Sequence, residues 1–159
     1  MPITEELTKL GQSVRRLNEG SAEIDALVAA IDARLGALAI PFDYLHPRPL
    51  RETTTVGAGG KRVIEVAYIG FLPYHGQRCL VVKTVKIHES KAAAVAAQGG
   101  SLTPLVQAPR GLVHATVDVL GEVVRAIRSQ LDELAAQVDR RAAAAQRALA
   151  ELEGSDGAG

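Results

Sequence analysis

Large aromatic side chains are scarce in this sequence. Tryptophan is absent, and the 159 residues include only three Tyr and two Phe. The buried surface must therefore come mainly from aliphatic side chains, which favours thin, elongated packing over a thick globular core. Apolar residues still make up 47% of the chain, and this share argues against a wholly disordered protein.

Three further absences exclude classes of protein. The single Cys79 cannot form an internal disulfide. Eighteen basic and eighteen acidic residues cancel, so the chain lacks the positive charge expected of a protein that binds nucleic acid through its phosphates. No signal-peptide pattern and no continuous apolar run of about 18 residues is present. We therefore expect a cytoplasmic protein that binds neither nucleic acid nor membranes.

A repeat of apolar residues at alternating steps of three and four predicts a helix over residues 3–38. The repeat continues for five heptads with Ser21 as its one polar member, which indicates a helix that packs by knobs into holes. Thr4 is the expected N-cap, and Gly20 with Ser21 either kinks the helix or starts a second segment. The seam positions are Ile3, Leu7, Leu10, Val14, Leu17, Ser21, Ile24, Val28, Ile31, Leu35 and Leu38.

The same repeat predicts a second helix over residues 110–152. Its seam holds Val113, Val117, Leu120, Val124, Ile127, Leu131, Leu134 and Val138. A four-residue stutter then brings Ala142, Ala145, Leu149 and Leu152 into line. Leu27, Leu112 and Val123 widen the apolar stripes beside the two seams. A surface this wide favours self-association, because a pair of helices would leave part of it in water.

Between the helices the period changes to that of β-strands. Residues 61–72 and 78–89 are rich in β-branched side chains and are separated by a turn at 73–77, which predicts an antiparallel pair. Residues 50–56 could add a third strand. Residues 40–50 contain three prolines and predict an irregular connection, whereas the alanine-rich residues 90–100 favour either a brief helix or a linker.

These elements predict an α+β fold in which two long heptad-repeat helices form an antiparallel coiled-coil hairpin around a small central antiparallel β-sheet of two or three strands. Residues 1–153 are expected to form one domain and residues 154–159 a disordered tail. The preferred register of the hairpin places Ser21 opposite Ile127 and Asp32 opposite His114. The order of helix, strand pair and helix resembles that of prefoldin-type proteins, in architecture alone.

Two stretches resemble ligand sites without meeting their requirements. The run Gly57 to Lys61 looks like a phosphate-binding loop, but a strand follows it where that loop needs a helix, so a hairpin turn is expected. His75 and His88 stand at opposite ends of one predicted strand and cannot share a metal ion in a monomer. We expect no metal, no cofactor and no catalytic use of Cys79.

The best candidate for a ligand-binding site is the group Asp43, Tyr44 and His46 in the proline-rich loop. A carboxylate, a phenol and an imidazole come close together there. The structural interpretation is that Tyr44 and Leu45 anchor the connection to the end of the helix while Asp43 and His46 face solvent.

The sequence favours a non-enzymatic coiled-coil interaction or scaffold protein that acts as a homo-oligomer. One alternative is a small ligand-binding or catalytic domain with its site in the 40–50 loop. Another is a prefoldin-like holdase that uses a partly apolar sheet. The interface or core seam is expected to contain Leu17, Ile24, Leu27, Val28, Ile31, Val123, Val124, Ile127, Leu131 and Leu134.

Overall fold

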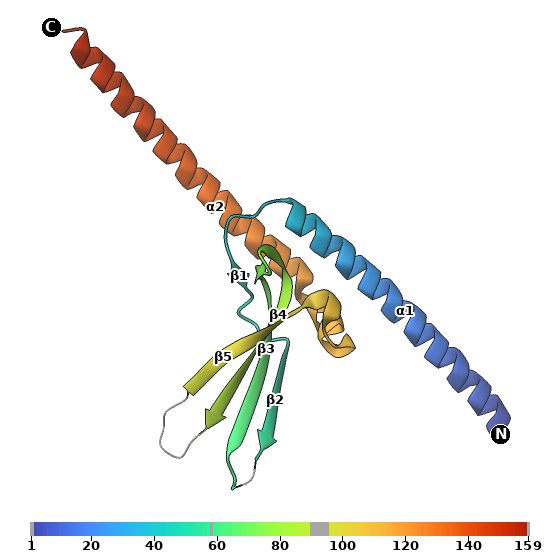
Figure 1. Cartoon of the computed structure of the whole chain (residues 1–159). Helices are drawn as coiled ribbons and strands as arrows, with labels where there is room; N and C mark the ends of the chain where they lie inside the picture. Colours follow the sequence, from blue (N-terminus) through green and yellow to red (C-terminus); the bar gives the residue numbers. More distant parts are fainter. Residues whose placement is uncertain (1, 58, 90–95, 159) are drawn as a thin grey trace. The chain divides into compact units, whose positions relative to one another are not determined.

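The computed structural model describes residues 2–57, 59–89 and 96–158. Over these residues the elements are, in order, α1 (Ile3–Ala37), β1 (Tyr44–Leu45), β2 (Arg51–Val56), β3 (Arg62–Tyr74), β4 (Gln77–Glu89), β5 (Ala96–Pro104), the 3-10 helix η1 (Leu105–Gln107) and α2 (Arg110–Asp156), as Figure 1 shows. The chain divides into two compact units, Met1–Leu120 and Gly121–Gly159.

The hairpin of β3 and β4 is the centre of the first unit. Its register runs without a break from Arg62 opposite Glu89 to Tyr74 opposite Gln77. The two residues of the turn, His75 and Gly76, have φ angles of 49° and 84°. Positive φ at both positions is what a type I′ turn requires, and that turn matches the twist of the strands it joins. The predicted antiparallel pair is confirmed.

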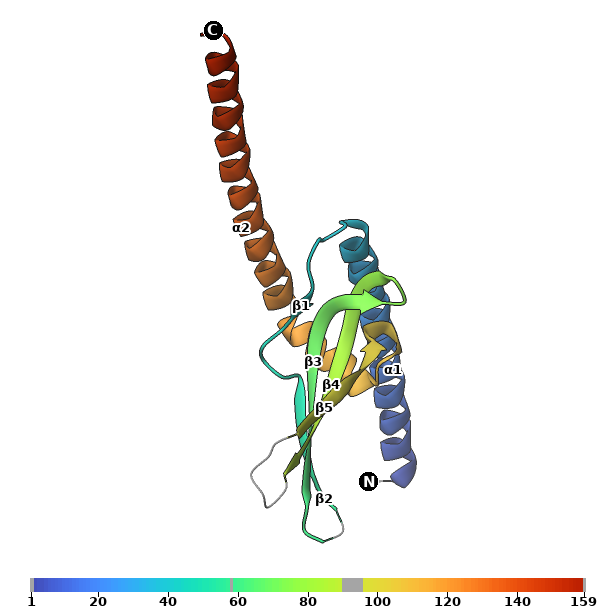
Figure 2. The same ribbon diagram turned by 60° about the vertical axis from the view of Figure 1, so that its left-hand side comes forward.

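One edge of β3 is shared by β2 and β1 (Figure 2). β2 is the predicted third strand, and its link to β3 is closed by a 2.8 Å bond from the Gly57 amide to the Lys61 carbonyl. The predicted hairpin turn is therefore confirmed in the part of residues 57–61 that the structure describes. Further along the edge, the Leu50 amide donates to the Ala67 carbonyl at 2.7 Å.

β1 forms within the proline-rich loop that we expected to be irregular. Tyr44 pairs with Phe71 and Leu45 with Gly70. A Cβ on Gly70 would lie 2.9 Å from the Tyr44 carbonyl oxygen, so glycine is what lets the two backbones approach.

β5 corrects the expectation of a helix or linker over residues 90–100. Residues 90–95 lie outside the described part of the chain, but from Ala96 onward the backbone pairs with β4. The register shifts between Thr84 and Lys86, which is the mark of a β-bulge. A Cβ on Gly100 would collide with the Thr84 carbonyl, so only glycine fits at this point.

The sheet is therefore larger than predicted: it has five antiparallel strands instead of two or three. Its most deeply buried side chains lie in the middle of β3 and β4 and in η1, and are Ile69, Phe71, Leu80, Val81, Val82 and Leu105. A single Phe among aliphatic residues agrees with the scarcity of aromatic side chains.

The prediction of a helical hairpin around a small sheet is also wrong. Within the first unit α1 packs against β4 and η1 (Figure 1). The Ser21 hydroxyl oxygen lies 3.4 Å from His114 Nε2, although the predicted register placed His114 opposite Asp32. The likeness to prefoldin depended on this hairpin and loses its geometric basis. The repeat predicted a long helix correctly, but an extended sheet surface competes with a second helix for the same apolar face.

The bounds of the helices agree closely with the sequence. α1 is continuous through Gly20, and Pro2 is its N-cap residue where we expected Thr4. α2 extends to Asp156, so its last turn includes part of the predicted tail. Neither helix, over the residues described, is long and apolar enough to cross a membrane.

The buried stripe of α2 agrees with the predicted seam in part. The seam residues Val113, Leu120 and Ile127 are buried, but Val117 and Val124 are exposed. Beside them Thr116, Val119 and Val123 are buried instead. One column of the seam is therefore displaced by one position, because α2 has apolar side chains on neighbouring columns and the heptad count alone cannot choose between them.

Candidate functional site

The structure separates the three loop residues that the sequence grouped together. Tyr44 and His46 are buried, and Asp43 is exposed. Because Tyr44 and His46 are two positions apart on an extended segment, they share one face, and Tyr44 Oη lies 2.8 Å from His46 Nδ1. The His46 amide also donates to the Ile69 carbonyl at 2.9 Å. The expectation that His46 faces solvent is wrong.

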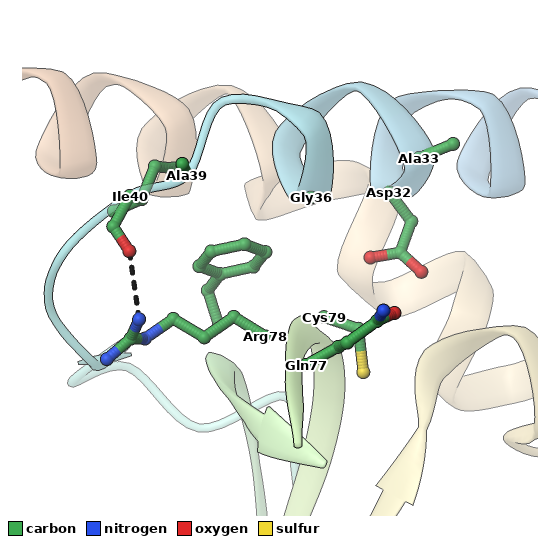
Figure 3. A pocket seen from close by; sticks show the side chains of 9 residues that line it. Asp32, Ala33, Gly36, Ala39, Ile40, Gln77, Arg78 and Cys79 are labelled. Atoms are coloured by element: carbon green, nitrogen blue, oxygen red, sulfur yellow. Dashed lines mark hydrogen bonds between the residues drawn. The ribbon is translucent and has the colours of Figure 1, made fainter. Parts of the chain in front are cut away.

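Asp43 joins the loop to the start of β4. Its Oδ1 accepts a 2.9 Å hydrogen bond from Arg78 Nε. Arg78 Nη1 donates to the Ile40 carbonyl at 3.0 Å, as the dashed line in Figure 3 shows. A single guanidinium therefore joins two points of the loop that follows α1, Ile40 and Asp43, to the start of β4.

A cavity of about 420 Å³ lies beside this connection (Figure 3), and we call it the Asp32 cavity. It is formed by the last turns of α1, the segment that follows them and the start of β4. Its lining consists of Asp32, Ala33, Gly36, Ala39, Ile40, Phe71, Gln77, Arg78 and Cys79.

Asp32 is the most unusual ionisable group in this cavity. One of its carboxylate oxygens accepts a 2.7 Å hydrogen bond from the Leu80 amide. β5 pairs with β4 only as far as Val81, so the carboxylate takes the place that a strand would occupy beside Leu80. Burial raises the pKa of Asp32 above its ordinary value, and the Leu80 hydrogen bond opposes that rise.

The Cys79 thiol is poorly suited to nucleophilic chemistry. Burial raises its pKa, and the nearby charge of Asp32 raises it further. A thiol must ionise before it attacks, and both effects oppose ionisation. His75 lies in the turn between β3 and β4, and His88 pairs with Val63 at the far end of β4. Among the residues that the structure describes, no group of three or more His, Cys, Asp or Glu side chains could hold a metal ion.

A second kind of surface lies on the N-terminal half of α1. Five large aliphatic side chains of the predicted seam are between 49% and 77% exposed. We call them the exposed seam, and they are Ile3, Leu7, Leu10, Val14 and Leu17. Toward the middle of the helix lies a shallow cavity of about 430 Å³, which is lined by Ser13, Arg16, Leu17, Gly20, Ser21, Ile24 and His114.

Sequence reasoning identified the apolar repeat that contains the exposed seam but expected the second helix to cover it, and it missed the Asp32 cavity. Asp32 sits among the small residues of a helix end, and nothing in the spacing of Asp32, Gly36 and Arg78 indicates that they meet. One signal was available: Ala33, Gly36 and Ala39 leave that face of the chain without large side chains, which permits a hollow.

The expected interface seam is divided by the structure. Val28, Val123 and Ile127 are buried, and Ile24, Ile31 and Leu131 are partly exposed. The exposed members are Leu17, Leu27, Val124 and Leu134.

In comparisons with known proteins, no family model matches the chain, and neither a curated protein nor a solved structure matches it.

Proposed function

We propose that this chain is a non-enzymatic interaction or scaffold protein that assembles with a second copy of itself through the exposed seam of α1. The observation that carries the proposal is the exposure of five consecutive seam residues, Ile3 to Leu17, on a helix whose other half is packed. A stripe of this length without cover is typical of a surface that a partner covers.

The residues beside the seam support a second copy as that partner. In the heptad frame, the two flanking columns hold Thr4, Gly11 and Asn18 on one side and Glu6, Ser13 and Gly20 on the other. Glu6 is the one charged residue among these six, so two copies would bring no rows of like charge together. The charged side chains Lys9, Arg15 and Arg16 lie on the outer columns, where they keep the helix hydrated.

The energy available is enough for association of moderate strength. Completing the burial of a half-exposed Leu, Ile or Val contributes about 1 kcal/mol, so ten such side chains from two copies contribute about 10 kcal/mol. Loss of free motion on association costs about 4–15 kcal/mol. At the low end of this cost about 6 kcal/mol remains, which corresponds to a dimer that dissociates at some tens of micromolar, with wider assembly if the exposed side chains of α2 also take part.

Sedimentation velocity between about 1 µM and about 200 µM tests the proposal, because a dimer of this strength must change its mass over such a range. Leu10→Glu with Val14→Glu should give a monomer at every concentration. Both positions are exposed, so the protomer should keep its fold and its circular dichroism.

The matched control adds the same two charges to the outer face of α1, at Gln12→Glu and Ala26→Glu, and should assemble like the original chain. A protein that stays monomeric at the highest concentration contradicts the proposal. So does a seam variant that assembles as well as the control.

A further inference from the structure

The Asp32 cavity has room for a small organic group because the residues above it are small. Ala33 and Gly36 face it from the last turns of α1, and Ala39 faces it from the segment beyond. Its volume of about 420 Å³ falls within the range of small-molecule sites. The Phe71 ring, which is buried in the sheet, forms part of its wall.

The charges around the cavity favour a cation. The Leu80 amide engages one oxygen of the Asp32 carboxylate, and no Lys or Arg of the described residues forms an ion pair with it. In Figure 3 the carboxylate points from α1 toward the strand that carries Gln77 and Cys79. The cavity also lies at the C-terminal end of α1, where the helix dipole is negative.

Arg78 does not neutralise Asp32. Its guanidinium lies on the opposite side of the cavity in Figure 3, where Asp43 and the Ile40 carbonyl hold it. Its charge is balanced by Asp43, so the three ionised groups Asp32, Asp43 and Arg78 leave one net negative charge at the cavity. Two of the five N–H donors of Arg78 are used by Asp43 and the Ile40 carbonyl, and an anionic ligand would still meet the net negative charge of the cavity.

From these observations we propose that the Asp32 cavity binds the ammonium group of a primary aliphatic amine. The ammonium donates to the second oxygen of Asp32, and the attached carbon chain lies along Phe71 and the small residues of α1. A primary ammonium is compact and has three donors, which suits a site with one carboxylate and the carbonyl end of a helix. This site is independent of the exposed seam.

A titration of the isotope-labelled full chain with n-butylammonium chloride at constant ionic strength tests the site. The amide signals of Gly36, Cys79 and Leu80 should shift and saturate. Asp32→Asn keeps an oxygen that accepts from Leu80 while it removes the charge, and it should weaken binding about tenfold. Asp25→Asn, an exposed change on the same helix, should bind like the original chain, and n-butanol should give no saturating shift.

A second variant guards against an indirect effect of Asp32→Asn. Gly36→Leu leaves Asp32 and its bond to Leu80 in place but fills the cavity, because a Cβ at Gly36 meets nothing closer than the Arg78 carbonyl at 3.7 Å. This variant should also lose binding. The absence of saturation in the original chain, or equal binding by the original chain and both variants, overturns the proposal and leaves Asp32 as a cap for Leu80 alone.

The ammonium group could come from a free amine or from a lysine side chain of another protein. Parallel titrations with 1,4-diaminobutane and with Nα-acetyl-lysine methylamide separate the two sources. Tighter binding of the diamine assigns the site to free amines, and tighter binding of the lysine derivative assigns it to lysine. Either result depends on Asp32 if the site is as proposed.

Discussion

Every seventh residue of α1 from Leu7 to Leu35 lies on the same column of the helix, yet exposure changes abruptly along that column. Leu7 and Val14 are 60% and 49% exposed, whereas Ser21, Val28 and Leu35 are 4%, 1% and 7% exposed. The apolar repeat is the same on both sides of the change. The one polar member, Ser21, is buried, and two apolar members are not.

The difference arises from what each half of α1 meets. The C-terminal half packs against β4, with Asp32 bonded to the Leu80 amide. Nothing in the described part of the chain covers the N-terminal half to the same degree. A heptad repeat therefore predicts that a helix face is suited to burial, but it does not predict whether a sheet, a helix or a second copy packs against that face.

A carboxylate introduced into each half of α1 should give the largest difference in stability between the two halves. Val28→Asp should lower the free energy of unfolding by about 3–5 kcal/mol, because it leaves an unpaired carboxylate in a buried position. Val14→Asp makes the same chemical change at an exposed position and should cost about 0.5 kcal/mol or less in dilute solution. Urea unfolding followed by circular dichroism measures both. Equal losses would show that the N-terminal half is packed within the monomer and would end the comparison.

Removing the link between α1 and β4 gives the next largest effect. Asp32→Ala leaves the amide of the buried Leu80 without its acceptor and should cost about 1–3 kcal/mol. Asp32→Asn retains an acceptor oxygen and should cost much less. Chemical unfolding of the two variants side by side measures the hydrogen bond, and equal losses would contradict its role.

The pH dependence of the same residue has a definite sign. Burial raises the pKa of Asp32, so the folded state holds its proton to a higher pH than the unfolded state does. The contribution of Asp32 is then most favourable below its unfolded pKa and is lost as pH rises through the folded pKa. Relative to the original chain, Asp32→Asn should become more stable as pH rises from about pH 4 through the raised pKa of Asp32. A constant difference across that range would show that the pKa is not raised.

The sequence predicted the elements that carry their own periodic signal. Both helices, the β3 and β4 pair and β2 followed from apolar spacing and from β-branched residues. β1 and β5 lack that signal, because one is two residues long and the other is rich in Ala and Gly. They become strands because a neighbouring edge offers them hydrogen bonds. Two glycines did indicate these pairings, because glycine within a strand often lies where another backbone approaches closely. They are Gly70, which faces β1, and Gly100, which lies in β5 against β4.

The candidate site was harder to predict than the fold. Asp43 was singled out for its neighbours in sequence, but in the structure its partner is Arg78, 35 positions away. The predicted register placed Asp32 opposite His114, whereas in the structure Asp32 accepts a hydrogen bond from the Leu80 amide, just beyond the point where β5 stops pairing with β4. The contacts of Asp32 with Leu80 and of Asp43 with Arg78 depend on the sheet topology, which the heptad pattern does not predict.

Replacing a glycine in the N-terminal half of α1 should have a smaller effect, confined to that half. A Cβ at Gly11 meets nothing within 4 Å, so Gly11→Ala should stabilise the exposed half of α1 by about 0.5–1 kcal/mol. Amide hydrogen exchange in dilute protein should be faster for residues 7–17 than for residues 24–35, and Gly11→Ala should slow it about threefold in the first segment alone. Equal slowing in both segments would mean that α1 opens as one unit.

The smallest expected effect concerns the ion pairs on the exposed half. Lys9 Nζ lies 3.0 Å from Glu5 and 3.8 Å from Glu6, one turn apart on a hydrated face. Lys9→Ala should weaken this part of α1 by about 0.3–0.5 kcal/mol, because water and ions screen exposed pairs. Arg16→Ala is the matched control, since Arg16 occupies the same heptad column and forms no ion pair among the described residues. Exchange of the amides between Lys9 and Val14 should accelerate less than threefold relative to that control, and the difference should vanish near 1 M salt. An effect that persists at high salt would show that the Lys9 side chain stabilises the helix by packing, and the N-terminal half would then be less solvated than the comparison requires.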